Sequence, residues 1–221
     1  MKYDDVKTDK GPRNMNAPAG EQAMKRGARA RSGKTLSSMA MFFREFLRHP
    51  VMVGSIIPSS KKLIRHMLSR CDWPNTKLFV EYGPGVGTFA EAILERLGPD
   101  ATYLVIDTNR EFIDYLRDRI HDPRFIAVHG SAADVMQIIK DNGHTQADYI
   151  LSGLPFSTLP PGIGPKIAHE THDALRTGGA FLVYQFSPKC RDFMALAFDH
   201  IDHAFEPVNI PPAQLYWGWK E

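Results

Sequence analysis

An acidic residue directly before a glycine-rich turn is the first feature of this chain that could support chemistry. Glu81 ends a short apolar run, and Gly83, Gly85 and Gly87 follow it. Such a turn brings bare backbone and a helix N-terminus close to a ligand. No Gly-Lys-Ser/Thr follows, which excludes a P-loop. A carboxylate is a poor neighbour for a pyrophosphate but suits the ammonium and sulfonium of S-adenosylmethionine. We therefore expect that cofactor to contact Glu81, Tyr82, Gly83, Gly85 and Gly87.

A second acid, Asp107, ends the next apolar run and is followed by Thr108. An acid at this place accepts hydrogen bonds from ribose hydroxyls in dinucleotide sites and in S-adenosylmethionine sites alike, so it does not discriminate between them. It also suits the N-cap of the following helix. Small residues against which an adenine can lie follow the third run: Gly130, Ser131 and Ala132. Ser131 is equally suited to be a helix N-cap, and the two roles are compatible.

A compact turn follows the fourth apolar run and is the candidate catalytic segment, with Ser152, Gly153, Leu154 and Phe156 as its residues. Ligands bind at the carboxyl ends of strands in open α/β sheets. Ser152 and an exposed backbone carbonyl can hold an amine nucleophile, and Ser152 also lies within reach of the cofactor. Phe156 can form one wall of the slot. The alternative is an ordinary turn with a core phenylalanine.

No residue stands out as a general base, although His129, His66 and Tyr184 are possible by type. Water or a backbone carbonyl of the 152–154 turn is the preferred proton acceptor. Aromatic faces favour a methylated cationic product by cation–π contact. The candidates for that contact are Tyr82, Phe156, Phe42 and Phe43. No metal ion is expected.

Alternating strand and helix signals must position these residues. Strands are expected near 78–82, 102–106, 124–129, 148–151 and 179–186. Helices are expected near 61–69, 88–97, 110–120, 132–140, 165–176 and 188–199. Two further strands surround the prolines at 211–212. The alternation predicts an α/β fold whose mostly parallel sheet carries helices on both faces, with an antiparallel hairpin at the C-terminal end.

The N-terminal part differs in composition from the rest. Residues 1–34 hold nine Lys or Arg and four acids, whereas the whole chain carries a net charge of +2. We expect a basic, largely disordered arm over 1–34, a helical segment over 35–70 that covers the site, and a cofactor-binding domain over 71–221. An amphipathic helix is expected at 36–48. Residues 25–48 then predict contact with an anionic membrane surface.

Compartment follows from what the sequence lacks. It has two cysteines, which form no disulfide framework, and its N-terminus lacks the apolar core of a signal peptide. No apolar run approaches the roughly 20 residues that a spanning helix needs. The expected location is cytoplasmic, peripheral at the inner face of a bacterial membrane.

These motifs, in this order, resemble those of class I S-adenosylmethionine-dependent methyltransferases, which implies a Rossmann-like seven-stranded sheet. The likeness is greatest to bacterial phospholipid N-methyltransferases, and segments 53–60 and 209–213 resemble that family too. The resemblance adds Ser55 and Pro58 to the cofactor-binding candidates. The related rRNA adenine dimethylases usually carry Asn at the position of Ser152, and this departure points away from a flipped adenine.

The resemblance implies stepwise N-methylation of phosphatidylethanolamine to phosphatidylcholine. Three alternatives remain open: N-methylation of an ornithine lipid, N-methylation of an rRNA adenine, and a non-catalytic protein that binds the cofactor or a membrane. Nucleic acid is not the first expectation, because no dedicated RNA-binding domain follows the sheet. The oligomeric state is not predicted.

Overall fold

The structure, a computed structural model, describes residues 60–156, 159–160, 162–186, 190–209 and 211–221. The expected arm at 1–34, the expected helix at 36–48 and the cofactor candidates Ser55 and Pro58 lie outside these residues. So do Phe42 and Phe43. Among the described residues, no helix is long and apolar enough to cross a membrane.

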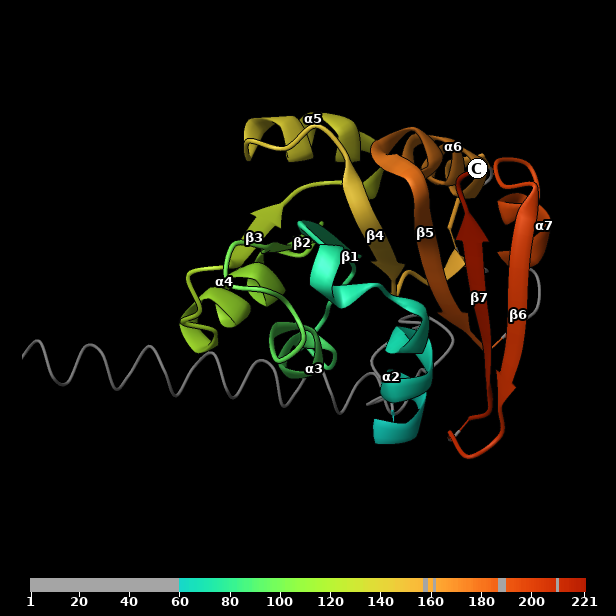
Figure 1. The fold of residues 1–221 in the computed structure, drawn as a ribbon, viewed down its shortest axis with the longest axis horizontal. Coiled ribbons are helices and arrows are strands. Elements are labelled where there is room, and N and C mark those ends of the chain that lie inside the picture. The colour runs from blue at the N-terminus through green and yellow to red at the C-terminus, as the bar shows by residue number, and fades with distance from the viewer. Residues whose placement is uncertain (1–59, 157–158, 161, 187–189, 210) are drawn as a thin grey trace, which may run out of the picture. The chain divides into compact units, whose positions relative to one another are not determined.

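The described residues form one seven-stranded sheet in the order β3-β2-β1-β4-β5-β7-β6 (Figure 1). Its strands are β1 (Leu78–Tyr82), β2 (Thr102–Asp107), β3 (Phe125–His129), β4 (Ala147–Ser152), β5 (Leu175–Gln185), β6 (His200–Glu206) and β7 (Ala213–Trp219). The first five strands pair in parallel, and β7 pairs antiparallel with both β5 and β6. The predicted mostly parallel sheet with an antiparallel C-terminal hairpin is confirmed.

Helices cover both faces of the sheet, as predicted (Figure 1). They are α2 (Lys61–Met67), α3 (Ala90–Leu94), α4 (Arg110–Arg119), α5 (Val135–Asp141), α6 (Ile163–Ala174) and α7 (Cys190–Met194), with short 3-10 turns at Leu68–Arg70, Trp73–Asn75 and Ala132–Asp134. One buried cluster lies under α2, α3 and α4, and a second lies under α5, α6 and α7. Alternation along β1 sends Phe79 to the first cluster, and Val80 and Tyr82 to the second.

Two elements differ from the expected ranges. The helix expected at 88–97 covers only Ala90–Leu94, because the residues before it form successive turns around Gly87, whose φ is +78°. The strand expected at 179–186 begins at Leu175. The register between β4 and β5 shifts there, so residues 176–179 form a bulge. A side chain at Gly179 would bring its Cβ within 2.7 Å of the Asp148 carbonyl oxygen.

Backbone hydrogen bonds continue the ladders one residue past the carboxyl ends of the central strands. The amide of Gly83 donates to the Ile106 carbonyl at 2.9 Å, and the amide of Gly153 donates to the Tyr82 carbonyl at 2.9 Å. The amide of Gly130 donates to the Asp107 carbonyl at 3.0 Å. These bonds hold the glycine turn, the Gly130 turn and the 152–156 turn at one edge, called here the catalytic edge.

Candidate functional site

The glycine turn presents bare backbone because its conformation and its neighbours exclude side chains. Gly83, Gly85 and Gly87 all have φ between +55° and +78°, which L residues rarely adopt. A Cβ at Gly87 would lie 2.7 Å from the Leu116 side chain. A Cβ at Gly83 would lie 3.0 Å from the Leu154 side chain. The turn is thus packed between two other elements and leaves its amide groups as the natural ligand contacts.

Glu81 is a buried carboxyl group at the end of β1, with only 1% of its surface exposed. It accepts a hydrogen bond from the hydroxyl of Tyr103, which lies on β2. Burial raises the pKa of Glu81 to about 7; the Tyr103 bond opposes this rise, and the nearby Asp107 adds to it. A bound cation would reverse this rise by stabilising the carboxylate, which is the behaviour expected of a site for a positively charged cofactor.

Asp107 ties the glycine turn to the end of β2. Its carboxylate accepts from the amide of Asn109 at 2.8 Å and from the amides of Gly85 and Thr108. Burial raises the pKa of Asp107, and these hydrogen bonds oppose that rise. Its interpretation as a helix N-cap is wrong, because Asn109 is the N-cap of α4 and accepts from the Glu111 amide. The carboxylate is therefore available to orient both the turn and a ribose.

The turn after β3 combines a structural role with the predicted one. The Ser131 hydroxyl accepts from the Ala133 amide at 3.2 Å, so its expected role as an N-cap is confirmed. A Cβ at Gly130 would approach the Ile138 side chain to 3.0 Å. Ala132 is buried. The predicted contact of this turn with an adenine stays a prediction.

The turn after β4 is closed by its own hydrogen bonds. The Ser152 hydroxyl, fully buried, accepts from the Leu154 amide at 3.2 Å. The Leu154 carbonyl accepts from the side-chain amide of Gln185 at 2.6 Å and from the Phe156 amide at 2.9 Å. Within the described residues the carbonyl of Gly153 accepts no hydrogen bond, although the residue is buried. A buried carbonyl without a donor favours a ligand donor at that place.

Phe156 packs more deeply than a slot wall requires. Its ring lies 4.3 Å from that of Phe193 and meets the Phe181 ring edge-on. Tyr82 points to the same side of the sheet, and its hydroxyl lies 3.1 Å from that of Thr171. Only the backbone of Tyr82 therefore reaches the glycine turn, through its bond to Gly153.

The three candidate bases lie apart. His129 is exposed at the end of β3, with Nε2 3.0 Å from the Thr108 carbonyl oxygen. His66 lies on α2, with Nδ1 3.4 Å from a carboxylate oxygen of Glu206. Tyr184 is mostly buried, and its ring packs 5.3 Å from that of Phe89. None of them is placed against the Ser152–Phe156 turn by a contact between described residues.

Two contributors escaped the sequence analysis. Tyr103 holds Glu81, and period-2 alternation from Asp107 back along β2 could have placed it on the same face. Gln185 holds Leu154, and its signal was a polar residue ending an otherwise apolar strand.

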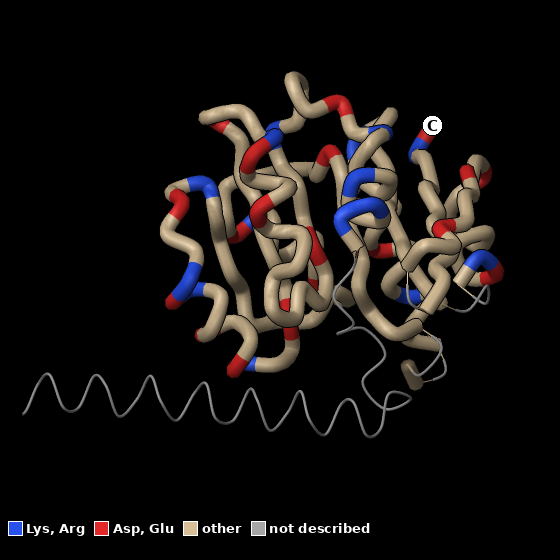
Figure 2. The backbone as a smooth tube through the Cα atoms, turned by 90° about the horizontal axis from the view of Figure 1, so that it is seen from below, with Lys and Arg blue, Asp and Glu red and all other residues tan. Residues whose placement is uncertain are grey.

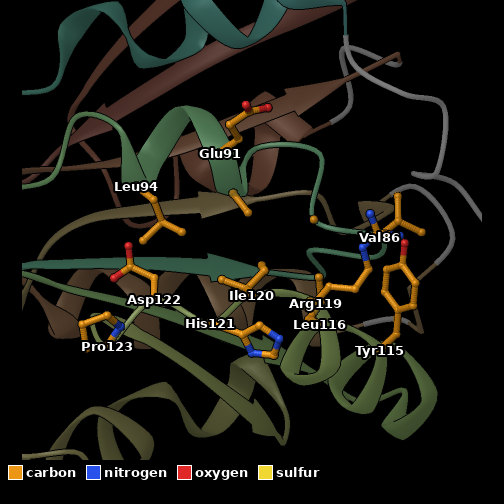
Figure 3. A pocket seen from close by; sticks show the side chains of 12 residues that line it. Val86, Glu91, Leu94, Tyr115, Leu116, Arg119, Ile120, His121, Asp122 and Pro123 are labelled. Carbon is orange, nitrogen blue, oxygen red and sulfur yellow. The ribbon is translucent and has the colours of Figure 1, made fainter.

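A groove of about 600 Å³ runs between α3 and α4 (Figure 3). Figure 3 shows Tyr115 and Arg119 at the end near Val86, and Pro123 at the opposite end. Of the predicted site residues only Gly87 borders this groove. It is therefore separate from the acids and turns of the catalytic edge.

Comparison with known proteins gives consistent results. Residues 79–179 match a family described as "Methyltransferase domain". The chain is 31% identical over 185 residues to the ornithine lipid N-methyltransferase of Singulisphaera acidiphila, covering 82% of this chain and 96% of that protein. It is 34% identical over 82 residues to the ribosomal RNA small subunit methyltransferase H of a Psychrobacter species, covering 37% of this chain and 24% of that protein.

Solved structures share the fold. The precorrin-6y C5,15-methyltransferase of Geobacter metallireducens superposes with a TM-score of 0.58 at 12% identity, covering 73% of this chain and 89% of that one. The T. thermophilus 16S rRNA N2 G1207 methyltransferase, solved with AdoMet and guanosine, gives 0.57 at 15% identity, covering 77% and 45%.

Proposed function

Since this chain belongs to the class I S-adenosylmethionine-dependent methyltransferases, we propose that it methylates the amino nitrogen of a membrane lipid, with an ornithine lipid as first candidate. S-adenosylmethionine is its cofactor. The observation that carries the lipid is the 31% identity to an ornithine lipid N-methyltransferase over nearly the whole of that protein. Phosphatidylethanolamine is the second candidate, favoured by the likeness of the 152–156 turn to phospholipid N-methyltransferases.

The residues at the catalytic edge fit the cofactor. The glycine amides and the carboxylates of Glu81 and Asp107 would hold it, Glu81 towards the positive charges and Asp107 towards the ribose. When bound, S-adenosylmethionine supplies an electrophilic methyl group on a sulfonium, which leaves as a neutral thioether. The buried Glu81 loses its proton as the cation arrives, so binding releases a proton below about pH 7.

The 152–156 turn orients the nucleophile. A lipid amine enters protonated and must become neutral to react, so it first donates to an acceptor and then passes a proton to water. Because the Leu154 carbonyl already accepts two hydrogen bonds, we assign the acceptor to the carbonyl of Gly153. Alignment and removal of water then supply most of the rate.

Membrane contact through residues 25–48, at the cytoplasmic face, is part of this proposal and concerns residues outside those described. The experiment uses the full chain with methyl-labelled S-adenosylmethionine. Vesicles holding ornithine lipid, vesicles holding phosphatidylethanolamine, and rRNA are offered separately. Label in the lipid extract supports the proposal, and the two vesicle types decide the headgroup. Label only in RNA, or in none of the three, contradicts it.

A further inference from the structure

We propose that α2 and the β6–β7 turn form a docking surface that presses the catalytic edge onto an anionic lipid bilayer. The docking surface consists of Lys61, Lys62, Arg65, Phe205 and Val208. The inference rests on the proposed function, because only a lipid substrate requires the enzyme to work at a bilayer. It is separate from any contact by residues 25–48.

The docking surface lies at the catalytic edge because of strand direction. β7 runs antiparallel to β5, and Gln214 near the start of β7 lies opposite Gln185, the last residue of β5. The β6–β7 turn therefore extends beyond the same edge as the Ser152–Phe156 turn. The amide of Ser60, the N-cap of α2, donates to the Asn209 side chain at 3.0 Å. Figure 1 shows α2 and this turn next to each other.

The exposed charge on this surface is positive. α2 contains no acid, and Lys61, Lys62 and Arg65 are exposed (Figure 2). The acid of the turn, Glu206, has a side chain only 2% exposed. Its carboxylate accepts from the Val208 amide at 3.2 Å and lies 3.3 Å from Lys62 Nζ. Cations near an anionic bilayer each contribute about 1 kcal/mol of attraction.

Apolar side chains stand beside these cations. Phe205 and Val208 are 50% and 58% exposed, and they are two of the four exposed large hydrophobic residues in the described part of the chain. A third, Ile163, begins α6 shortly after the 152–156 turn. Apolar groups beside a cationic surface are the combination that binds at a lipid interface.

The turn presents Val208 in a fixed geometry. The buried Asn209 side chain accepts from Ser60 and donates to the Pro211 carbonyl at 2.8 Å. The Val208 amide is held by Glu206 at 3.2 Å. These bonds lower the ordering cost of inserting the side chain into a bilayer. A nucleic acid would use the cations but would gain little from Val208, which favours lipid as the partner.

The test measures sedimentation of the full chain with vesicles of equal parts phosphatidylglycerol and phosphatidylcholine. Lys61→Gln combined with Arg65→Gln should weaken vesicle binding about thirtyfold, and Val208→Asp about tenfold. The matched controls are Lys77→Gln combined with Lys140→Gln, and Leu196→Asp. These residues are exposed and outside the docking surface. The controls should stay within about twofold of the parent chain.

A second readout separates docking from the proposed function. The docking variants should lose methylation of vesicle lipid while retaining that of the same lipid dispersed in detergent micelles. A parent chain that methylates lipid in neither form refutes the proposed function, while vesicle sedimentation still judges docking. Docking is overturned if the variants bind vesicles like the controls, including the outcome in which they lose binding only to an rRNA fragment.

Discussion

Replacing Glu81 by Gln should make the protein more stable and less able to bind its cofactor. The carboxyl is buried, and burial raises its pKa from 4.5 to about 7. The folded state therefore holds this proton more tightly than the unfolded state does. Stability falls as the pH rises from about 4.5 to 7, and the full penalty is present above 7. A pKa difference of this size corresponds to roughly 3 kcal/mol.

The amide keeps the size of the carboxyl and can still accept from Tyr103, but it never ionises. Glu81→Gln should thus raise the free energy of unfolding at pH 8 by up to roughly 3 kcal/mol and change it little at pH 4.5. Affinity for S-adenosylmethionine should fall about ten- to a hundredfold, because a hydrogen bond to a charged group is lost. Urea unfolding at several pH values and titration calorimetry measure the two effects.

Glu95→Gln is the matched control, since Glu95 is exposed and should change neither quantity much. A Glu81→Gln protein whose stability gain is the same at pH 4.5 and pH 8, or absent at both, would refute the role of burial. Unchanged cofactor affinity would remove Glu81 from the cofactor site.

Two further substitutions test the site. Gly87→Ala should cost roughly 1–3 kcal/mol in urea unfolding, because φ is +78° and the new Cβ would lie 2.7 Å from Leu116; Gly98→Ala, with nothing within 4 Å, should cost far less, and equal costs would count against the argument. Tyr103→Phe removes the hydroxyl that donates to Glu81 and should raise the pKa of Glu81 further, moving the pH dependence of cofactor affinity to higher pH; a profile that stays in place would show that the bond is unimportant.

The architecture was predictable because its signals are local. Apolar runs ending in small or acidic residues marked β1 to β4, and their alternation with helical patterns required a parallel sheet. Ser131 could be recognised as a cap because the bond it makes spans only two residues. The family and cofactor followed from the order of these segments, and both are confirmed.

What the sequence missed depends on contacts between distant residues. The early start of β5 was hidden because residues 176–179 resemble a turn, and the bulge exists only against β4. The Leu154 carbonyl was expected to assist the amine, but Gln185, 31 residues away in sequence, donates to it. The bond between Tyr103 and Glu81 depends on the β1–β2 register, and the pKa of Glu81 depends on burial.

The most direct test of the central claim is tandem mass spectrometry of lipid recovered after incubating the full chain with vesicles and deuterium-labelled S-adenosylmethionine. The account predicts labelled methyl groups on the amino nitrogen of the ornithine headgroup, or of phosphatidylethanolamine if that is the substrate. It also predicts that Asp107→Ala, which removes the ribose contact, sharply reduces the labelling. Recovery of both lipids unlabelled, with an intact and folded protein that binds the cofactor, would contradict it.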